Sequence, residues 1–91
     1  MTTLSAKLTF YIPHAQSLKD KRAVVRGVID KTRRKFNVSV AEVDTQDAHQ
    51  TLTLGIAVVS GEHAHARKMV DEITRFMERV TDAELISITE D

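Results

Sequence analysis

The 91-residue chain contains no cysteine and no tryptophan, one proline and three glycines, and its only aromatic side chains are three phenylalanines and one tyrosine. The lack of cysteine excludes a disulfide framework and a thiolate metal site, and it is typical of a reducing compartment. No segment approaches the roughly 18 apolar residues of a membrane span, and the first residues lack a signal-peptide pattern. We therefore expect a cytoplasmic protein with no membrane association.

Composition otherwise predicts an ordinary globular chain. Apolar residues make up 42% of the sequence and charged residues 29%, which is far from the composition of a disordered chain. A chain of this length is too short for two ordinary domains but long enough to bury one core. Residues 1–91 are therefore expected to form a single domain.

The formal net charge is zero, but the charges are divided unevenly along the chain. Residues 1–35 contain nine basic and two acidic side chains, a net charge of +7, whereas residues 36–91 contain four basic and eleven acidic side chains, a net charge of −7. Such a chain can present a basic surface despite its neutral total.

Hydrophobic periodicity predicts six elements in the order β-α-β-β-α-β. Strict alternation indicates a strand that ends at Pro13, and Ser17 fits the N-cap of a helix that continues to about Asn37. The later elements are a strand over 38–43, a polar hairpin loop over 44–50, a strand over 51–59, a helix with an apolar stripe from 66 to 80, and a strand within 82–90. This order predicts an α+β, ferredoxin-like sandwich, in which a four-stranded antiparallel sheet has both helices on one face.

The strand over 38–43 has an irregular pattern, because the alternation slips between Val40 and Ala41. The slip is compatible with a β-bulge at that point. In the predicted topology, the segment Pro13 to Ser17, the start of the first helix and the loop Asp44 to Gln50 meet at one end of the sheet.

The first helix carries eight cations, which helix electrostatics explains only in part. Arg33, Arg34 and Lys35 lie in the last turn, where positive charge favourably meets the negative end of the helix dipole. Lys19 and Lys21 lie in the first turn, where a cation is unfavourable and anions are attracted.

One flank of that helix is strongly basic, since Lys19, Arg22, Arg26 and Arg33 fall together when positions advance by about 100° per residue. Two interpretations are open. The cations are either solvated or paired with Asp44 and Asp47, as charge runs on helices commonly are, or they bind phosphate.

The sequence gives little support for catalysis or metal binding. His63 and His65 are two residues apart and point to different sides of a helix, and Glu42, Asp44 and Asp47 fit ordinary turn chemistry. No glycine-rich phosphate loop and no Ser-His-Asp order is present. We expect no catalytic residues, no metal and no cofactor, and a protein that is not an enzyme.

The outer face of the predicted sheet lacks the signature of an RNA-recognition motif, which stacks bases on aromatics of its first and third strands. The strand over 51–59 has no aromatic residue, and Tyr11 is the only outward aromatic of the first strand. The mildly apolar residues of this face are instead compatible with a homodimer surface; they are Val43, Ala57, Val59 and Leu85.

The chain resembles the YlxP-like family of small bacterial proteins, also called DUF503. The resemblance rests on the segments Ala15-Gln16-Ser17-Leu18-Lys19-Asp20-Lys21-Arg22, Lys35-Phe36-Asn37-Val38-Ser39-Val40-Ala41-Glu42-Val43-Asp44, Gln46-Asp47 and Leu54-Gly55-Ile56-Ala57-Val58-Val59. It implies a ferredoxin-like fold and, from the usual gene neighbours of the family, a role in translation or ribosome assembly. Many relatives have tryptophan where this chain has His49, and histidine retains some capacity to stack.

Taken together, these observations predict a non-enzymatic binding module for ribosomal RNA or a ribosomal particle, which uses the basic start of the first helix. The candidate nucleic-acid or anion-binding residues are Ser17, Lys19, Lys21, Arg22, Arg26 and His49. The alternatives from other classes are a small-ligand sensor or oligomerisation (dimer) domain on the same fold, and hydrolysis of a phosphorylated substrate at the same basic end.

Overall fold

The computed structural model describes residues 1–90 of the chain. Its elements follow the predicted β-α-β-β-α-β order: β1 (Thr2–Tyr11), α1 (Leu18–Lys35), β2 (Ser39–Glu42), β3 (Thr51–Ser60), α2 (His63–Val80) and β4 (Glu84–Glu90). The molecule is elongated, with extents of 42 × 23 × 16 Å.

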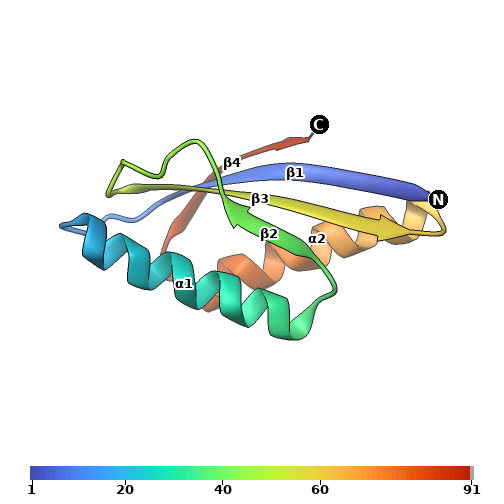
Figure 1. Cartoon of the computed structure of the whole chain (residues 1–91), viewed down its shortest axis with the longest axis horizontal. Helices are drawn as coiled ribbons and strands as arrows, with labels where there is room; N and C mark the ends of the chain where they lie inside the picture. Colours follow the sequence, from blue (N-terminus) through green and yellow to red (C-terminus); the bar gives the residue numbers. More distant parts are fainter. Residues whose placement is uncertain (91) are drawn as a thin grey trace.

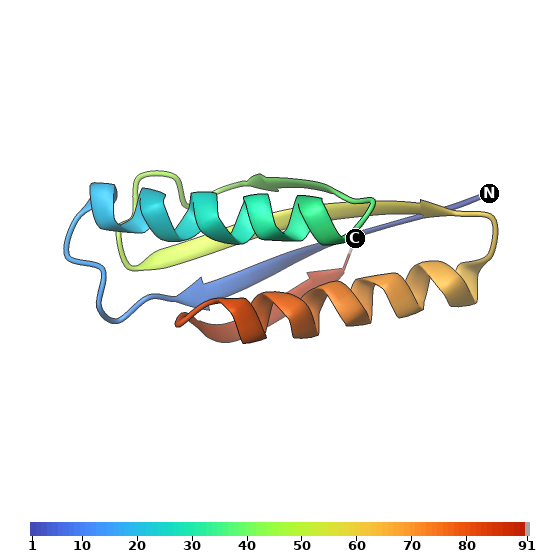
Figure 2. The same cartoon turned by 90° about the horizontal axis from the view of Figure 1, so that it is seen from below.

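The four strands form one antiparallel sheet in the order β2-β3-β1-β4. Both helices lie on the same face of this sheet, below it in Figure 1, and they run in opposite directions in the view from below in Figure 2. The β2–β3 loop rises at the opposite face (Figure 1). This arrangement is the predicted ferredoxin-like α+β sandwich.

The core forms between the helices and the inner face of the sheet because the central strands alternate. Leu8 and Phe10 of β1 and Leu52 and Leu54 of β3 are fully buried, and they face the apolar stripes of α1 and α2. The other core residues are Ala6, Ile12, Ala15, Val25, Val28, Val40, Ile56, Val58, Ala66, Val70, Ile73, Met77 and Ala83.

The bulge considered for the second strand is absent, because β2 pairs with β3 in continuous register from Ser39 to Glu42. A register shift occurs instead between β1 and β4, at Thr9 and Phe10. The apparent slip has another cause: the position that follows Val40 on the inner face is occupied by the charged residue Glu42.

The apolar surface also differs from the one expected. Leu85 lies opposite Phe10 and packs against the core rather than on the outer face. Ile86 and Ile88 of β4 are instead 58% and 46% exposed, and Val59 of β3 is 58% exposed. The edge strand β4 therefore carries exposed apolar side chains that the sequence pattern had not singled out.

Candidate nucleic-acid interface

Helix α1 begins with the N-cap that the sequence predicts. The Ser17 hydroxyl accepts a hydrogen bond from the Asp20 backbone N–H at 3.1 Å, and the Asp20 carboxylate accepts one from the Gln16 N–H, also at 3.1 Å. These contacts satisfy free donors at the helix start and place a negative charge beside the positive end of the dipole. Ser17 thus serves the helix itself, and the anion-attracting capacity of this end is already partly used by Asp20.

Lys21 occupies a position that contradicts its predicted role as a phosphate contact. Its side chain is only 1% exposed, and its ammonium group donates hydrogen bonds to the backbone carbonyls of Thr45 and Ala48. The Glu42 carboxylate lies 2.6 Å from Lys21 Nζ. A buried cation with three oxygen neighbours has no donor left for an external anion, so Lys21 is removed from the candidate site.

The internal partner of Lys21 is not one of the expected acids. Asp44 forms an ion pair with Lys7 at 2.7 Å, and Asp47 is exposed. The Glu42 side chain is 17% exposed, and its Oε2 atom is buried. Within residues 1–90 this oxygen accepts no hydrogen bond, and its partner is the Lys21 ammonium group in the ion pair. The ion pair joins α1 to the end of β2 and fixes both relative to the loop.

The β2–β3 loop is positioned by further contacts at the same end of the sheet. Asp44 has a φ of 62°, a left-handed conformation that aspartate tolerates better than most residues. The Thr45 hydroxyl accepts a hydrogen bond from the Thr53 N–H at 2.8 Å, and Gln50 Nε2 donates to the Pro13 carbonyl at 3.3 Å. The predicted meeting of this loop with the start of α1 is therefore confirmed.

The remaining predicted cations of α1, Lys19, Arg22 and Arg26, are exposed. Within residues 1–90, no ion pair or hydrogen bond joins their side chains to an acidic residue. Unlike Lys21, these three are available to an external anion.

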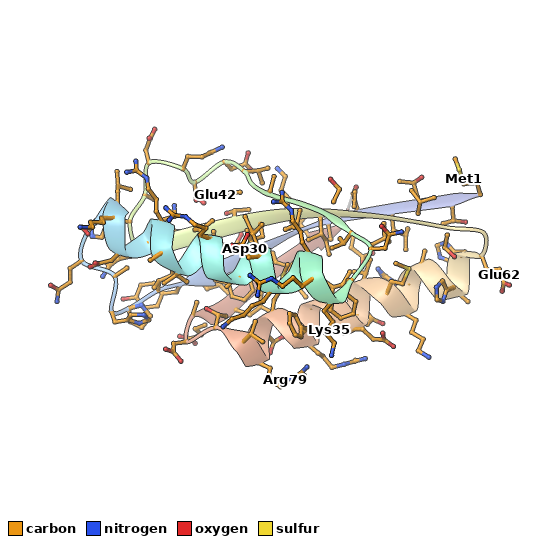
Figure 3. The ribbon with its side chains drawn as sticks, turned by 60° about the horizontal axis from the view of Figure 1, so that its bottom comes forward. Met1, Asp30, Lys35, Glu42, Glu62 and Arg79 are labelled. Atoms are coloured by element: carbon orange, nitrogen blue, oxygen red, sulfur yellow. The ribbon has the colours of Figure 1, made fainter. Side chains whose placement is uncertain are left out.

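Arg22 and Arg26 line a shallow groove along α1 that also includes a cation assigned to the helix dipole, Arg33. We call it the arginine groove; its lining residues are Arg22, Val25, Arg26, Ile29, Asp30 and Arg33. Figure 3 shows α1 from this side, with Asp30 labelled on the helix. Arg33 Nη2 donates to the Val40 carbonyl at 2.9 Å, whereas the side chains of Arg22 and Arg26 form no ion pair within residues 1–90. The groove combines three cations and one carboxylate over an apolar floor.

His49 lies in the loop and is exposed, as Tyr11 is at 38%. Both belong to the end of the sheet where α1 starts, but the internal Lys21 contacts lie between the loop and the helix. His49 is not among the residues that line the arginine groove.

From the sequence, Glu42 was assigned to turn chemistry rather than to an internal ion pair, and Arg33 was explained by the helix dipole alone. A signal for Glu42 was present, because it falls on the same strand face as Val40 and Lys21 falls within the apolar stripe that contains Val25 and Val28. Two charges of opposite sign at core-facing positions predict an internal ion pair. The helical projection had already placed Arg33 on the same flank as Arg22 and Arg26, but the favourable interaction of a last-turn cation with the helix dipole was enough to explain its charge.

Across residues 1–90, no three His, Cys, Asp or Glu side chains gather closely enough to hold a metal ion. None of the helices in that range is both long and apolar enough to cross a membrane.

A de novo designed protein with a ferredoxin fold, solved by solution NMR, matches all of this chain and 84% of its own length with a TM-score of 0.62 and 21% identity; at that identity the match supports the fold alone. The model of the family described as "Protein of unknown function (DUF503)" matches residues 3–90. The chain belongs to this family.

A curated relative agrees with this assignment. The chain is 36% identical over 70 residues to the uncharacterized protein YlxP of Bacillus subtilis (strain 168), a match that covers 77% of this chain and 76% of the relative. The family resemblance seen in the sequence segments is therefore confirmed.

Proposed function

We propose that this protein is a non-enzymatic module that binds structured RNA, such as ribosomal RNA, in the cytoplasm through the arginine groove of α1. The observation that carries the proposal is the alignment of Arg22, Arg26 and Arg33 along one groove that contains a single carboxylate, Asp30. Arginine is well suited to phosphate because its planar guanidinium offers paired donors in a fixed geometry.

The helical spacing suits a phosphate backbone. Arg22 and Arg26 are four residues apart, so their positions are separated by about 6 Å along the helix axis, and Arg33 lies roughly 10 Å further on. The apolar floor formed by Val25 and Ile29 allows the arginine stems to pack while the charged groups reach outward. Lys19 lies at the N-terminal end of the same flank.

The outer sheet face is a poor alternative surface for RNA. Its one exposed aromatic residue, Tyr11, stands alone, and the central strand β3 presents Thr, Gly, Ala and Val there. Recognition by base stacking on the sheet requires two or more aromatics on adjacent strands. The exposed residues therefore favour contacts to phosphate over contacts to unstacked bases.

The proposal is tested by measuring binding to ribosomal RNA fragments by fluorescence anisotropy at several salt concentrations. Three phosphate contacts predict a slope of about −2 to −3 in a plot of log K against log salt, or roughly a 20- to 40-fold loss of affinity between 50 and 200 mM. Replacing Arg26 by alanine lowers affinity and reduces that slope by about one.

The matched control removes one exposed cation from the other helix. Lys68 of α2 has a side chain 72% exposed and a distant i,i+4 contact with Glu72 at 3.9 Å, so Lys68→Ala changes net charge as Arg26→Ala does. If Arg26→Ala and Lys68→Ala weaken RNA binding equally, the binding depends on the net charge of the protein and not on the arginine groove. Absence of binding at low salt, with intact folding by circular dichroism, rules out the proposed function.

A homodimer remains a second candidate, and the exposed edge of β4 favours it. An antiparallel pairing of two β4 strands centred on Ser87 places Ile86 of one copy opposite Ile88 of the other, two side chains that are exposed in the single chain. Light scattering tests this directly. The dimer domain is favoured over the RNA module if the unaltered protein is a dimer, if Ile86→Lys converts it to a monomer, and if no salt-sensitive RNA binding is found.

A further inference from the structure

A second basic cleft lies on the other side of α1, where its last turn faces α2. We call it the interhelical cleft; its lining residues are Lys35, Phe36, Glu72, Arg75, Phe76 and Arg79. Figure 3 shows the labelled Lys35 and Arg79 on the same side of the molecule, one from each helix. Like the arginine groove, this cleft combines three cations, one carboxylate and two apolar side chains.

An aromatic pair holds the cations of this cleft in place. Phe36 and Phe76 pack edge to face with ring centroids 5.4 Å apart. Lys35 Nζ lies 5.4 Å from the Phe76 centroid, and Arg79 Cζ lies 5.5 Å from the same centroid. Both distances are within the range of a cation–π interaction, so two like charges converge on one ring.

The positive charge of the cleft is poorly compensated within residues 1–90. Its only carboxylate, Glu72, also lies 3.9 Å from Lys68, and no acidic residue in that range forms an ion pair with Lys35, Arg75 or Arg79. Two cations held by one ring, with a third beside them, repel one another. A bound phosphate would relieve this repulsion.

The two basic surfaces are on opposite flanks of one helix. When positions of α1 advance by about 100° per residue, Arg22, Arg26 and Arg33 project about 140° to 180° away from Lys35. The body of the helix, about 10 Å across, separates them. A ligand that contacts both must therefore present two rows of negative charge, one on either side of a ridge about 10 Å across.

We propose that α1 lies along the minor groove of double-stranded RNA, with the arginine groove on the phosphates of one strand and the interhelical cleft on those of the other. This inference rests on the proposed RNA-binding function and names its ligand class. The minor groove of an A-form duplex is wide and shallow, so a helix packed against a sheet approaches it without deep insertion. Single-stranded RNA is disfavoured because Phe36 and Phe76 are already occupied by each other and by cations.

The test compares three ligands of equal length: a duplex RNA, a single-stranded RNA and a duplex DNA. The protein variants are Arg22→Ala/Arg26→Ala for the arginine groove and Lys35→Ala/Arg79→Ala for the interhelical cleft. Each double variant removes two phosphate contacts, so we expect each to lose about 25- to 60-fold in duplex RNA affinity at 0.1 M salt and to reduce the salt slope by nearly two.

Because Lys35 and Arg79 contact the aromatic pair, their loss could disturb local packing. Arg75→Ala provides a second variant, since Arg75 lines the cleft without a cation–π interaction with either ring. We expect it to weaken duplex RNA binding about 5- to 8-fold at 0.1 M salt. Lys68→Ala remains the control for Arg75→Ala, because it removes one positive charge from a residue that lines neither surface.

The outcomes separate this inference from the function on which it rests. Weakening by both double variants and by Arg75→Ala, with preference for duplex RNA, supports the two-strand arrangement. If only the arginine-groove variant loses affinity, or if single-stranded RNA or duplex DNA binds as well as duplex RNA, the two-strand inference is overturned while RNA binding itself stands. If the unaltered protein binds none of the ligands at low salt, the proposed function fails and the inference fails with it.

Discussion

Replacing Lys21 by methionine probes the buried contact that joins α1 to the β2–β3 loop. Methionine retains most of the side-chain volume but leaves the Glu42 carboxylate without its partner at 2.6 Å and the carbonyls of Thr45 and Ala48 without a donor. Breaking a buried ion pair from one side costs about 3–5 kcal/mol, because the remaining charge stays poorly solvated. That is a large part of the stability of about 5–15 kcal/mol expected for a small domain.

The assay is unfolding in urea, monitored by circular dichroism. For an m value of about 2 kcal/mol per M, the Lys21→Met variant should unfold at a urea concentration about 1.5–2.5 M lower than the unaltered protein. Glu42→Gln keeps a neutral acceptor near the ammonium and should cost less, about 1–3 kcal/mol. The double variant Lys21→Met/Glu42→Gln leaves no unpaired charge, so its loss should be smaller than the sum of the two single losses by about 1–3 kcal/mol.

The adjacent exposed residue supplies the control. Arg22→Met makes the same kind of change one position along the helix and should alter stability by no more than about 0.5 kcal/mol. A loss below about 1 kcal/mol for Lys21→Met, with an unchanged m value, refutes the burial of the ammonium group. Additive single losses in the double variant refute the direct pairing of Lys21 with Glu42.

Two further variants test local contacts. Ser17→Ala removes the N-cap acceptor of the Asp20 N–H and should lower the free energy of unfolding by about 1 kcal/mol in the same urea assay, whereas Ser17→Asp should retain most of it. Arg67→Ala removes an ion pair with Glu90 whose side chains are 38% and 48% exposed; its cost should stay below about 1 kcal/mol and shrink in 1 M salt, and a larger, salt-insensitive loss would point to packing instead.

The fold was predictable because its signals are local and agree with one another. The alternation in β1 and β3, the Ser17 cap and the apolar stripe of α2 each specify one element, and the short connections leave few topologies. The extent of β2 was less predictable: it spans Ser39–Glu42, and its register depends on an inward charge.

The candidate site was predictable only in part, since side-chain direction within α1 decides which cations are available. Lys21 and Arg22 are adjacent in sequence and belong to the same basic segment, yet one is buried and the other exposed. Lysine is so rarely buried that its default assignment is to the surface. The exception required Glu42 and two loop carbonyls, which only the tertiary arrangement brings together.

The contacts in the structure show which cations of the basic first 35 residues are paired with acids. If the basic first 35 residues served mainly to stabilise the fold, their cations would be paired with the acids that follow them. Within residues 1–90, ion pairs join only Lys7 and Lys21 of those nine cations to acids, Asp44 and Glu42. The other seven all belong to α1. Folding thus leaves a positive field concentrated on one helix, and a field of this kind acts on a polyanionic partner at distances up to the Debye length of about 10 Å at 0.1 M salt.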